Sequence, residues 1–231
     1  MSKTAVVLLS GGIDSATVAM MAVRQGFSVH AITFSYGQRH AIEIDCARRV
    51  AAQIGIAGHI VIDLNHAVFA SSSLVAESGI PVPHGRDYAH SADIPSTYVP
   101  ARNILFLSYA LAYGETVGAH DIFIGVNAID YSGYPDCRPE FIEAFARMAD
   151  LGTRSGAEGR GFVIHAPLVD MTKAEIIAHG HALGVDYSLT HSCYDPDREG
   201  RSCGTCDSCR IRRAGFSDAH LADPTRYRSA S

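Results

Sequence analysis

Ser10-Gly11-Gly12-Ile13-Asp14-Ser15 follows an apolar run at residues 5–9 and precedes a helical pattern from residue 16 to about 25. A strand, a glycine-rich turn and a helix in this order make a phosphate site, because glycines let the backbone approach an anion and the first N–H groups of a helix have no internal partner. The adjacent glycines and the lack of a Lys exclude a Walker loop. We expect the Ser10 and Ser15 hydroxyls to add donors, and Asp14 to hold a magnesium ion or cap N–H groups.

Strand-length apolar runs alternate with longer helical patterns along the next 180 residues. This rhythm predicts an α/β fold, with a doubly wound, mostly parallel, Rossmann-like sheet that binds ligands at the carboxyl ends of its strands. Thr172 and Glu175 predict a capping box for the last of these helices. Residues 71–96 are irregular, with three prolines, and read as a lid-like or partly disordered loop. We predict strands at residues 28–34, 59–64, 121–126 and 162–165, and helices at 41–54, 103–117, 139–149 and 173–183.

Composition narrows the class of protein. With 231 residues, 47% of them hydrophobic, the chain is long enough for one α/β domain, predicted at 1–188, and a small C-terminal segment at 189–231. A net charge of −5 speaks against a protein that coats nucleic acid. No apolar run approaches the ~20 residues of a membrane span, and the first residues lack a signal-peptide layout. We therefore expect a cytoplasmic protein with reduced cysteines, with no membrane or nucleic-acid partner.

Four cysteines in the polar C-terminal segment have the pattern C-x9-C-x2-C-x2-C: Cys193, Cys203, Cys206 and Cys209. Closely spaced thiolates in a segment without a core of its own suit a tetrahedral zinc ion, one per chain; an iron–sulfur cluster is the alternative. Four protein ligands leave no open position, so this zinc is predicted to be structural. Cys46 reads as a core residue, and Cys137 as either a packing residue or a reactive thiol.

Other polar residues stand where strands end or helices begin. Arg39 follows the second strand and is either a phosphate ligand or part of a solvated turn. Arg102 and Asn103 begin the long apolar helix, and Lys173 begins another, so both cations are candidates for an anion site. The loop at residues 126–138 suits a flat heteroaromatic ligand: Tyr131 or Tyr134 to stack, Asp130 or Asp136 to accept from a guanine-like edge, and Arg138 to pair with a carboxylate.

The motif at residues 10–15 resembles the pyrophosphate loop of the ATP pyrophosphatase (PP-loop) superfamily, which has an adenine nucleotide alpha hydrolase-like fold. Together with residues 36–40, 97–103, 130–141, 192–194 and 203–209, the chain is similar to the QueC family of queuosine biosynthesis. The resemblance implies a ligase that converts 7-carboxy-7-deazaguanine, ammonia and ATP into a 7-cyano product, by adenylation of the carboxylate and then of the amide.

The resemblance also implies roles for individual residues, and a homodimer is expected. The catalytic residues would be Asp14, Arg102 and Lys173. The deazaguanine would be bound by Asp130, Tyr131, Tyr134, Asp136 and Arg138. ATP and its magnesium would be bound by Leu8, Leu9, Ser10, Gly11, Gly12, Ile13, Asp14, Ser15, Ala16, Thr17, Val18 and Arg39.

Two other functions remain open from the sequence. A tRNA-thiolating enzyme could use the same ATP loop, but it would need a persulfide-carrying cysteine and an RNA-binding surface. A zinc module that binds nucleic acid is suggested by Arg210, Arg212 and Arg213 beside the cysteines, but it leaves the ATP loop without a purpose.

Overall fold

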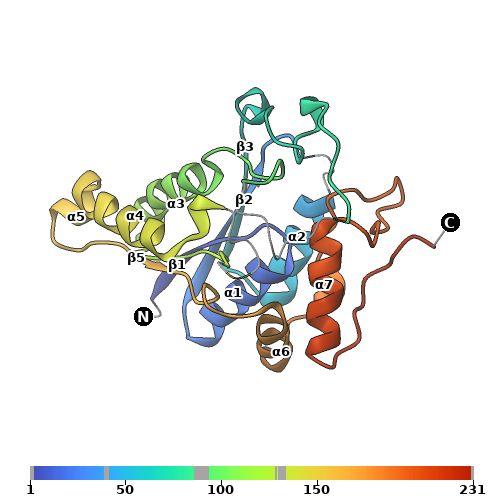
Figure 1. The fold of residues 1–231 in the computed structure, drawn as a ribbon. Helices are drawn as coiled ribbons and strands as arrows, with labels where there is room; N and C mark the ends of the chain where they lie inside the picture. The colour runs from blue at the N-terminus through green and yellow to red at the C-terminus, as the bar shows by residue number, and fades with distance from the viewer. Residues whose placement is uncertain (1–2, 39–41, 86–93, 128, 130–133, 230–231) are drawn as a thin grey trace.

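The computed structural model describes residues 3–38, 42–85, 94–127, 129 and 134–229 (Figure 1). Its centre is a five-stranded sheet in the order β3-β2-β1-β4-β5, and every strand pair in it is parallel. The strands are β1 (Thr4–Leu8), β2 (Ser28–Ser35), β3 (Gly58–Asp63), β4 (Asp121–Phe123) and β5 (Val163–His165). The strand order reverses direction between β1 and β4, which is the point where such sheets bind ligands.

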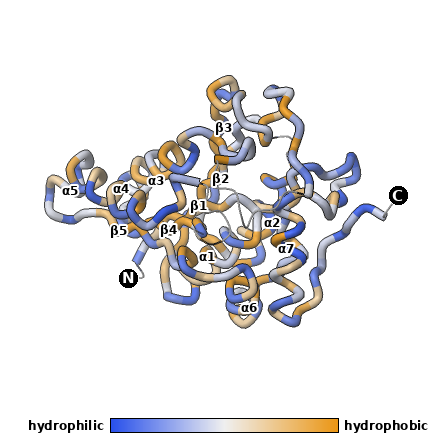
Figure 2. The backbone as a smooth tube through the Cα atoms, in the orientation of Figure 1, coloured by the Kyte–Doolittle hydropathy of each residue, from blue (hydrophilic) through white to orange (hydrophobic). Residues whose placement is uncertain are grey.

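Helices cover both faces of the sheet, which confirms the doubly wound architecture. Alternate residues of β1 separate the two cores: Val7 packs with α1, α2, α6 and α7, and Val6 packs with α3 and α4. The hydropathy colouring shows apolar residues along the central strands and a mostly polar trace after α7 (Figure 2). The helices are α1 (Ile13–Arg24), α2 (Ile42–Ile54), α3 (Arg102–Val117), α4 (Pro139–Gly152), α5 (Arg154–Ala157), α6 (Lys173–Leu183) and α7 (Asp207–Asp218).

The first helix begins three residues earlier than its periodicity predicted. Gly12 is the N-cap of α1, and its carbonyl accepts from the N–H of Ala16 at 3.1 Å. The glycine turn and the helix start therefore form one continuous unit. At α6 the predicted capping box is present, with the Thr172 side chain accepting from the N–H of Glu175 and the Glu175 side chain accepting from the N–H of Thr172.

The fourth strand is shorter than predicted and ends at Phe123 instead of continuing to residue 126. The chain that leaves it passes against the start of α1: a Cβ at Gly125 would lie 3.1 Å from the backbone nitrogen of Ser15. This close approach places the end of β4 beside the glycine-rich turn.

Several segments outside the predicted elements also contain regular structure. A short 3-10 helix at His66–Phe69 precedes the irregular region, and its Phe69 side chain is buried in the core. A second 3-10 helix, Ala76–Ser78, lies within that region. In the C-terminal segment, α7 was not predicted. It lies beside α6 (Figure 1), and Phe216 joins the main core, so this segment packs on the α/β body. The division at residue 188 stays a prediction.

Candidate active site

A cavity of about 220 Å³ opens at the carboxyl ends of β1, β2 and β4, around the glycine-rich turn. Its polar lining comes from the turn itself, the segments that follow β2 and β4, the segment before α4, the starts of α2, α3 and α6, and the C-terminal segment. The polar side chains that line it are Ser10, Asp14, Ser15, Tyr36, Gln38, Glu43, Arg102, Asn103, Asn127, Tyr134, Cys137, Lys173, His191, Ser192, Tyr194, Ser208 and Arg212.

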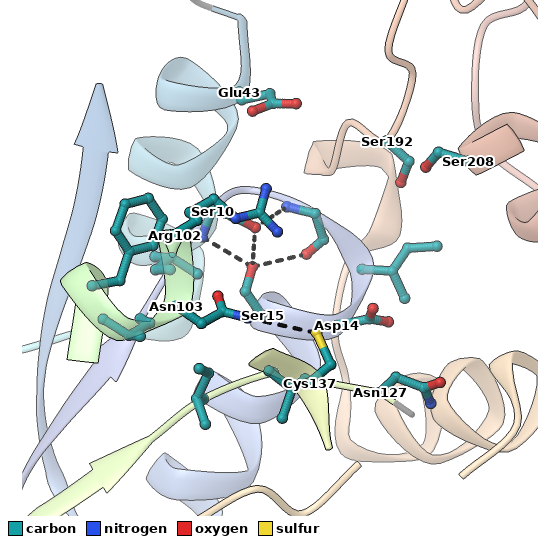
Figure 3. Close-up of a pocket in the computed structure, with 18 of the residues that line it drawn as sticks. Ser10, Asp14, Ser15, Glu43, Arg102, Asn103, Asn127, Cys137, Ser192 and Ser208 are labelled. Carbon is teal, nitrogen blue, oxygen red and sulfur yellow. Dashed lines mark hydrogen bonds between the residues drawn. The ribbon is translucent and has the colours of Figure 1, made fainter. Parts of the chain in front are cut away.

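The turn is held by its own hydroxyl groups (Figure 3). Ser15 Oγ accepts from the N–H of Ser10 at 3.1 Å and donates to the Gly12 carbonyl at 3.2 Å, and the two Ser hydroxyls lie 3.0 Å apart. Gly11 has φ +85°, and a Cβ there would lie 2.4 Å from the Glu43 carbonyl oxygen on α2. Glycine is therefore required at this position both by the backbone conformation and by the packing of α2.

The predicted residues Asp14 and Lys173 meet in the cavity. Lys173 Nζ donates to Asp14 Oδ1 at 2.5 Å, and the Lys173 side chain is only 8% exposed. Lys173 is the first residue of α6, directly after the Thr172 cap, while Asp14 lies in the first turn of α1. The N-cap of α1 is Gly12, without a side-chain cap hydrogen bond, and the Asp14 carboxylate accepts from Lys173 instead. The magnesium role of Asp14 stays a prediction.

Arg102 lines the same cavity and is the first residue of α3. The preceding residue, Ala101, is the N-cap in a left-handed conformation (φ +53°), which an L-residue other than glycine rarely adopts. Burial lowers the pKa of Arg102, but the nearby Tyr36, Tyr134 and Asp136 raise it by more than burial lowers it. The net shift is upward, so the guanidinium stays charged. Burial raises the pKa of Tyr36, so this hydroxyl stays neutral.

Of the residues predicted to bind the deazaguanine, the structure describes three, and only one of these three lines the cavity. Tyr134 lines the cavity and its hydroxyl lies 2.7 Å from Thr97 Oγ1. Asp136 is buried behind the wall, where Oδ2 accepts from the N–H of Asn103 at 3.1 Å and so fixes the start of α3. Arg138 is exposed at the N-cap of α4 and is not among the residues that line the cavity.

Arg39, Asp130 and Tyr131 lie outside the described residues. Of the residues predicted to bind ATP, most of those at 8–15 line the cavity, whereas Ala16, Thr17 and Val18 are buried inside α1. Thr17 Oγ1 donates to the Ile13 carbonyl at 2.9 Å and lies 2.8 Å from the Tyr187 hydroxyl, so it joins α1 to the C-terminal region. Their roles in ATP binding stay predictions.

Several residues that line the cavity were not predicted as site residues from the sequence. Glu43 comes from the first turn of α2, and burial raises its pKa to about 7, against the lowering effect of Arg102. His191, Ser192 and Tyr194 surround Cys193, and the N–H of His191 donates to the Gly11 carbonyl at 2.9 Å. The motif at 192–194 was a usable signal for this wall, but the helical pattern at 42–54 gave no reason to single out Glu43.

The four C-terminal cysteines converge on one point, with their sulfur atoms all within 4.8 Å of one another. Backbone N–H groups point at two of the sulfurs: Cys203 N donates to Cys193 Sγ at 3.1 Å, and Cys206 N donates to Cys203 Sγ at 3.2 Å. Such donors stabilise negative charge on sulfur, as metal-bound thiolates require. The cluster therefore fits a four-thiolate metal site.

The two other cysteines are buried. Cys46 packs on the inner face of α2, and burial raises the pKa of its thiol. Cys137 lines the cavity but is only 4% exposed, and burial together with Asp136 raises its pKa to about 12. Neither is set up as a reactive thiolate at neutral pH.

Comparison with known proteins decides the family. The model of the family described as "Queuosine biosynthesis protein QueC" matches residues 4–220. The chain belongs to the QueC family. It is 58% identical over its whole length to the 7-cyano-7-deazaguanine synthase of Kineococcus radiotolerans, and 57% identical over 98% of its length to that of Paramagnetospirillum magneticum, with both relatives covered completely.

Solved structures agree with the fold. An NMN synthetase from Francisella tularensis superposes with a TM-score of 0.51 over 96% of this chain and 79% of its own. A 4-thiouridine synthetase in complex with RNA and ATP gives 0.54 over 95% of this chain and 50% of its own. Both are 17% identical to this chain, so they support the α/β fold and nothing about substrate.

Proposed function

We propose that this enzyme converts 7-carboxy-7-deazaguanine, ammonia and ATP into 7-cyano-7-deazaguanine. The observation that carries the proposal is the full-length identity of 58% to a 7-cyano-7-deazaguanine synthase, in a chain whose cavity lies at a phosphate-type turn. The direct test is to incubate the purified protein with ATP, an ammonium salt and the acid and to detect the nitrile by mass spectrometry. Failure to form nitrile from a folded, metal-loaded protein would refute the proposal.

Activation of the acid explains why the cavity needs an ATP site. A carboxylate is a poor electrophile because its leaving group would be an oxide. Transfer of AMP to that oxygen makes a good leaving group, ammonia then gives the amide, and a second activation followed by elimination gives the nitrile. In this scheme the cavity contributes mainly by positioning and by stabilising the charge that develops on the departing pyrophosphate.

We assign the ATP phosphates to the turn at residues 10–15, with its backbone N–H groups at the start of α1. The charges of Lys173 and Arg102, which both line the cavity, would then meet phosphate oxygens. One carboxylate together with nucleotide phosphates is an ordinary donor set for magnesium, so Asp14 fits that role once Lys173 pairs with a phosphate instead. Magnesium would supply further neutralisation of the phosphate charge.

We assign the deazaguanine to the side of the cavity where Tyr134 lies, a residue that follows Asp130 and Tyr131 closely in the sequence. An aromatic ring suits the flat base, and a carboxylate suits its N–H edge, because an analogue that lacks those donors would leave the carboxylate unpaired. Asp136 and Arg138 are weaker candidates, since one is bonded to Asn103 and the other is exposed away from the cavity.

The cysteine cluster is proposed to hold one structural zinc ion, with Cys193, Cys203, Cys206 and Cys209 as its ligands. Convergence of the sulfurs and the N–H donors support a metal, and the polar segment around them supports a stabilising role. We further propose a cytoplasmic homodimer. No described helix combines the length and apolar character that a bilayer span requires. A thiolating function is disfavoured because Cys46 and Cys137 are buried thiols with raised pKa values.

A further inference from the structure

Two of the described residues that line the cavity carry a carboxylate, Asp14 and Glu43. Asp14 is engaged by Lys173 on the α6 side. Glu43 projects from α2, across the cavity from Ser192 and Ser208 (Figure 3). Its own backbone carbonyl is the atom that packs against Gly11, so the position of Glu43 is fixed relative to the phosphate turn. The roles proposed above for the residues of the cavity do not include Glu43.

Among the described residues, the titratable groups that act on Glu43 are Arg102 from α3, Tyr36 after β2 and Cys46 from α2 itself. Burial raises the pKa values of the Tyr36 hydroxyl and the Cys46 thiol, so both stay protonated, and Arg102 stays cationic. Burial raises the pKa of Glu43 itself to about 7, in the range that suits a general base at physiological pH.

The proposed reaction requires such a group. Ammonia is present in neutral water mainly as ammonium, which has no lone pair for attack, and every N–H bond of that ion is broken on the way to a nitrile. Asp14 is neutralised by Lys173, and Cys137 and Tyr36 are poor bases while protonated. His191 is the other group of the wall with a nitrogen that can accept a proton.

We propose that Glu43 is the catalytic base that takes a proton from ammonium before its nitrogen attacks the activated acyl carbon. This inference rests on the proposed function. In the step, the Glu43 carboxylate becomes a carboxylic acid and ammonium becomes ammonia. The nitrogen lone pair then forms the C–N bond, the bond from the acyl carbon to the AMP oxygen breaks, and AMP leaves with that electron pair. The nitrogen gives up one more proton to yield the amide, and Glu43 returns its proton to solvent.

The test compares two nucleophiles. Hydroxylamine is neutral at the same pH and needs no proton removal before attack, and it traps the activated acid as a hydroxamate. Glu43→Gln should lower nitrile formation from ammonium about a hundredfold, the usual contribution of a general base, while hydroxamate formation stays at the wild-type level. Glu43→Asp, which keeps a carboxylate, should recover part of the ammonium reaction. Asp45→Asn is the matched control, because Asp45 is an exposed carboxylate of the same helix, paired with Arg48.

Each outcome has one meaning. Loss of both products in Glu43→Gln would overturn the inference, since Glu43 would then hold the acid, the ATP or the fold. Full nitrile formation by this variant would also overturn it, as would a selective loss of the ammonium reaction in His191→Gln with none in Glu43→Gln. A wild-type protein that forms neither nitrile nor hydroxamate would refute the proposed function itself, and the inference with it.

Discussion

The contact between Gly11 and α2 allows a quantitative test of how the phosphate turn is built. Gly11→Ala would place a Cβ 2.4 Å from the Glu43 carbonyl oxygen and 2.8 Å from the Ala47 nitrogen, at a φ of +85°. Gly26→Ala is the matched control: its φ is +87°, but no atom lies within 4 Å of the new Cβ. Both variants place Ala in a left-handed conformation, at a cost of about 1–2 kcal/mol.

The clash adds a second cost only at residue 11. Overpacking against backbone atoms costs about 1–3 kcal/mol, so Gly11→Ala should lose about 2–5 kcal/mol of unfolding free energy and Gly26→Ala about 1–2 kcal/mol. Urea unfolding with an unchanged m value measures both losses. Since α2 must move to relieve the clash, Gly11→Ala should also weaken binding of a non-hydrolysable ATP analogue in calorimetry, while Gly26→Ala keeps wild-type affinity. Equal losses in the two variants would show that α2 does not fix the turn.

Four further predictions follow from the cavity and the cysteine cluster. Cys206→Ser should lower zinc content and melting temperature together, because metal binding contributes to folding free energy; full zinc with unchanged melting would rule out the site. Asp14→Asn should reduce turnover strongly in a protein that still folds, and a wild-type rate would refute its role. A folded-state pKa of Glu43 near 7, above its ordinary 4.5, means that its ionisation destabilises the folded state as pH rises through that window. Glu43→Gln should therefore gain about 1–3 kcal/mol relative to wild type at pH 8 and little at pH 4, and an equal effect at both pH values would contradict this. Asp130→Ala should raise KM for the acid far more than KM for ATP, and Arg102→Ala should raise KM for ATP far more than KM for the acid. If Asp130→Ala raises KM for ATP and spares the acid, the base pocket lies on another loop.

The sequence predicted the sheet and its helices well because their signals are local. The inner strands of the parallel sheet, β1, β2 and β4, are mostly buried and so read as apolar runs. The capping box at Thr172 marks the start of α6 to the residue. The end of β4 was placed three residues too late. Residues 124–126 are as apolar as a strand, but the approach of Gly125 to α1 ends the pairing, and that contact is not visible in the sequence.

Site residues that belong to a recognisable motif were predicted from the sequence. Site residues that only the fold brings together were not predicted. Asp14 and Lys173 are 159 positions apart. Asp14 was singled out by the motif at residues 10–15, and Lys173 because it begins a helix. Glu43 also begins a helix, yet an acidic residue in a first turn is common and carries no functional signal by itself. The role proposed for Glu43 depends on its place in the cavity and on burial, which raises its pKa, and both are properties of the folded chain.

The cysteine cluster and the phosphate turn are parts of one structure, and the segment that carries the cysteines was expected to pack on the α/β domain. Cys193 stands between Ser192 and Tyr194, which both line the cavity, and the N–H of His191 donates to Gly11. On α7, the buried Arg212 pairs with Asp223 at 3.0 Å and donates to Thr190 Oγ1, Ser192 Oγ and the Tyr187 carbonyl. A metal ion that ties Cys193 to α7 would therefore fix the wall next to the turn as well as the segment itself. In this geometry a zinc ion without an open coordination position would support catalysis indirectly, by holding in place the residues that line the cavity.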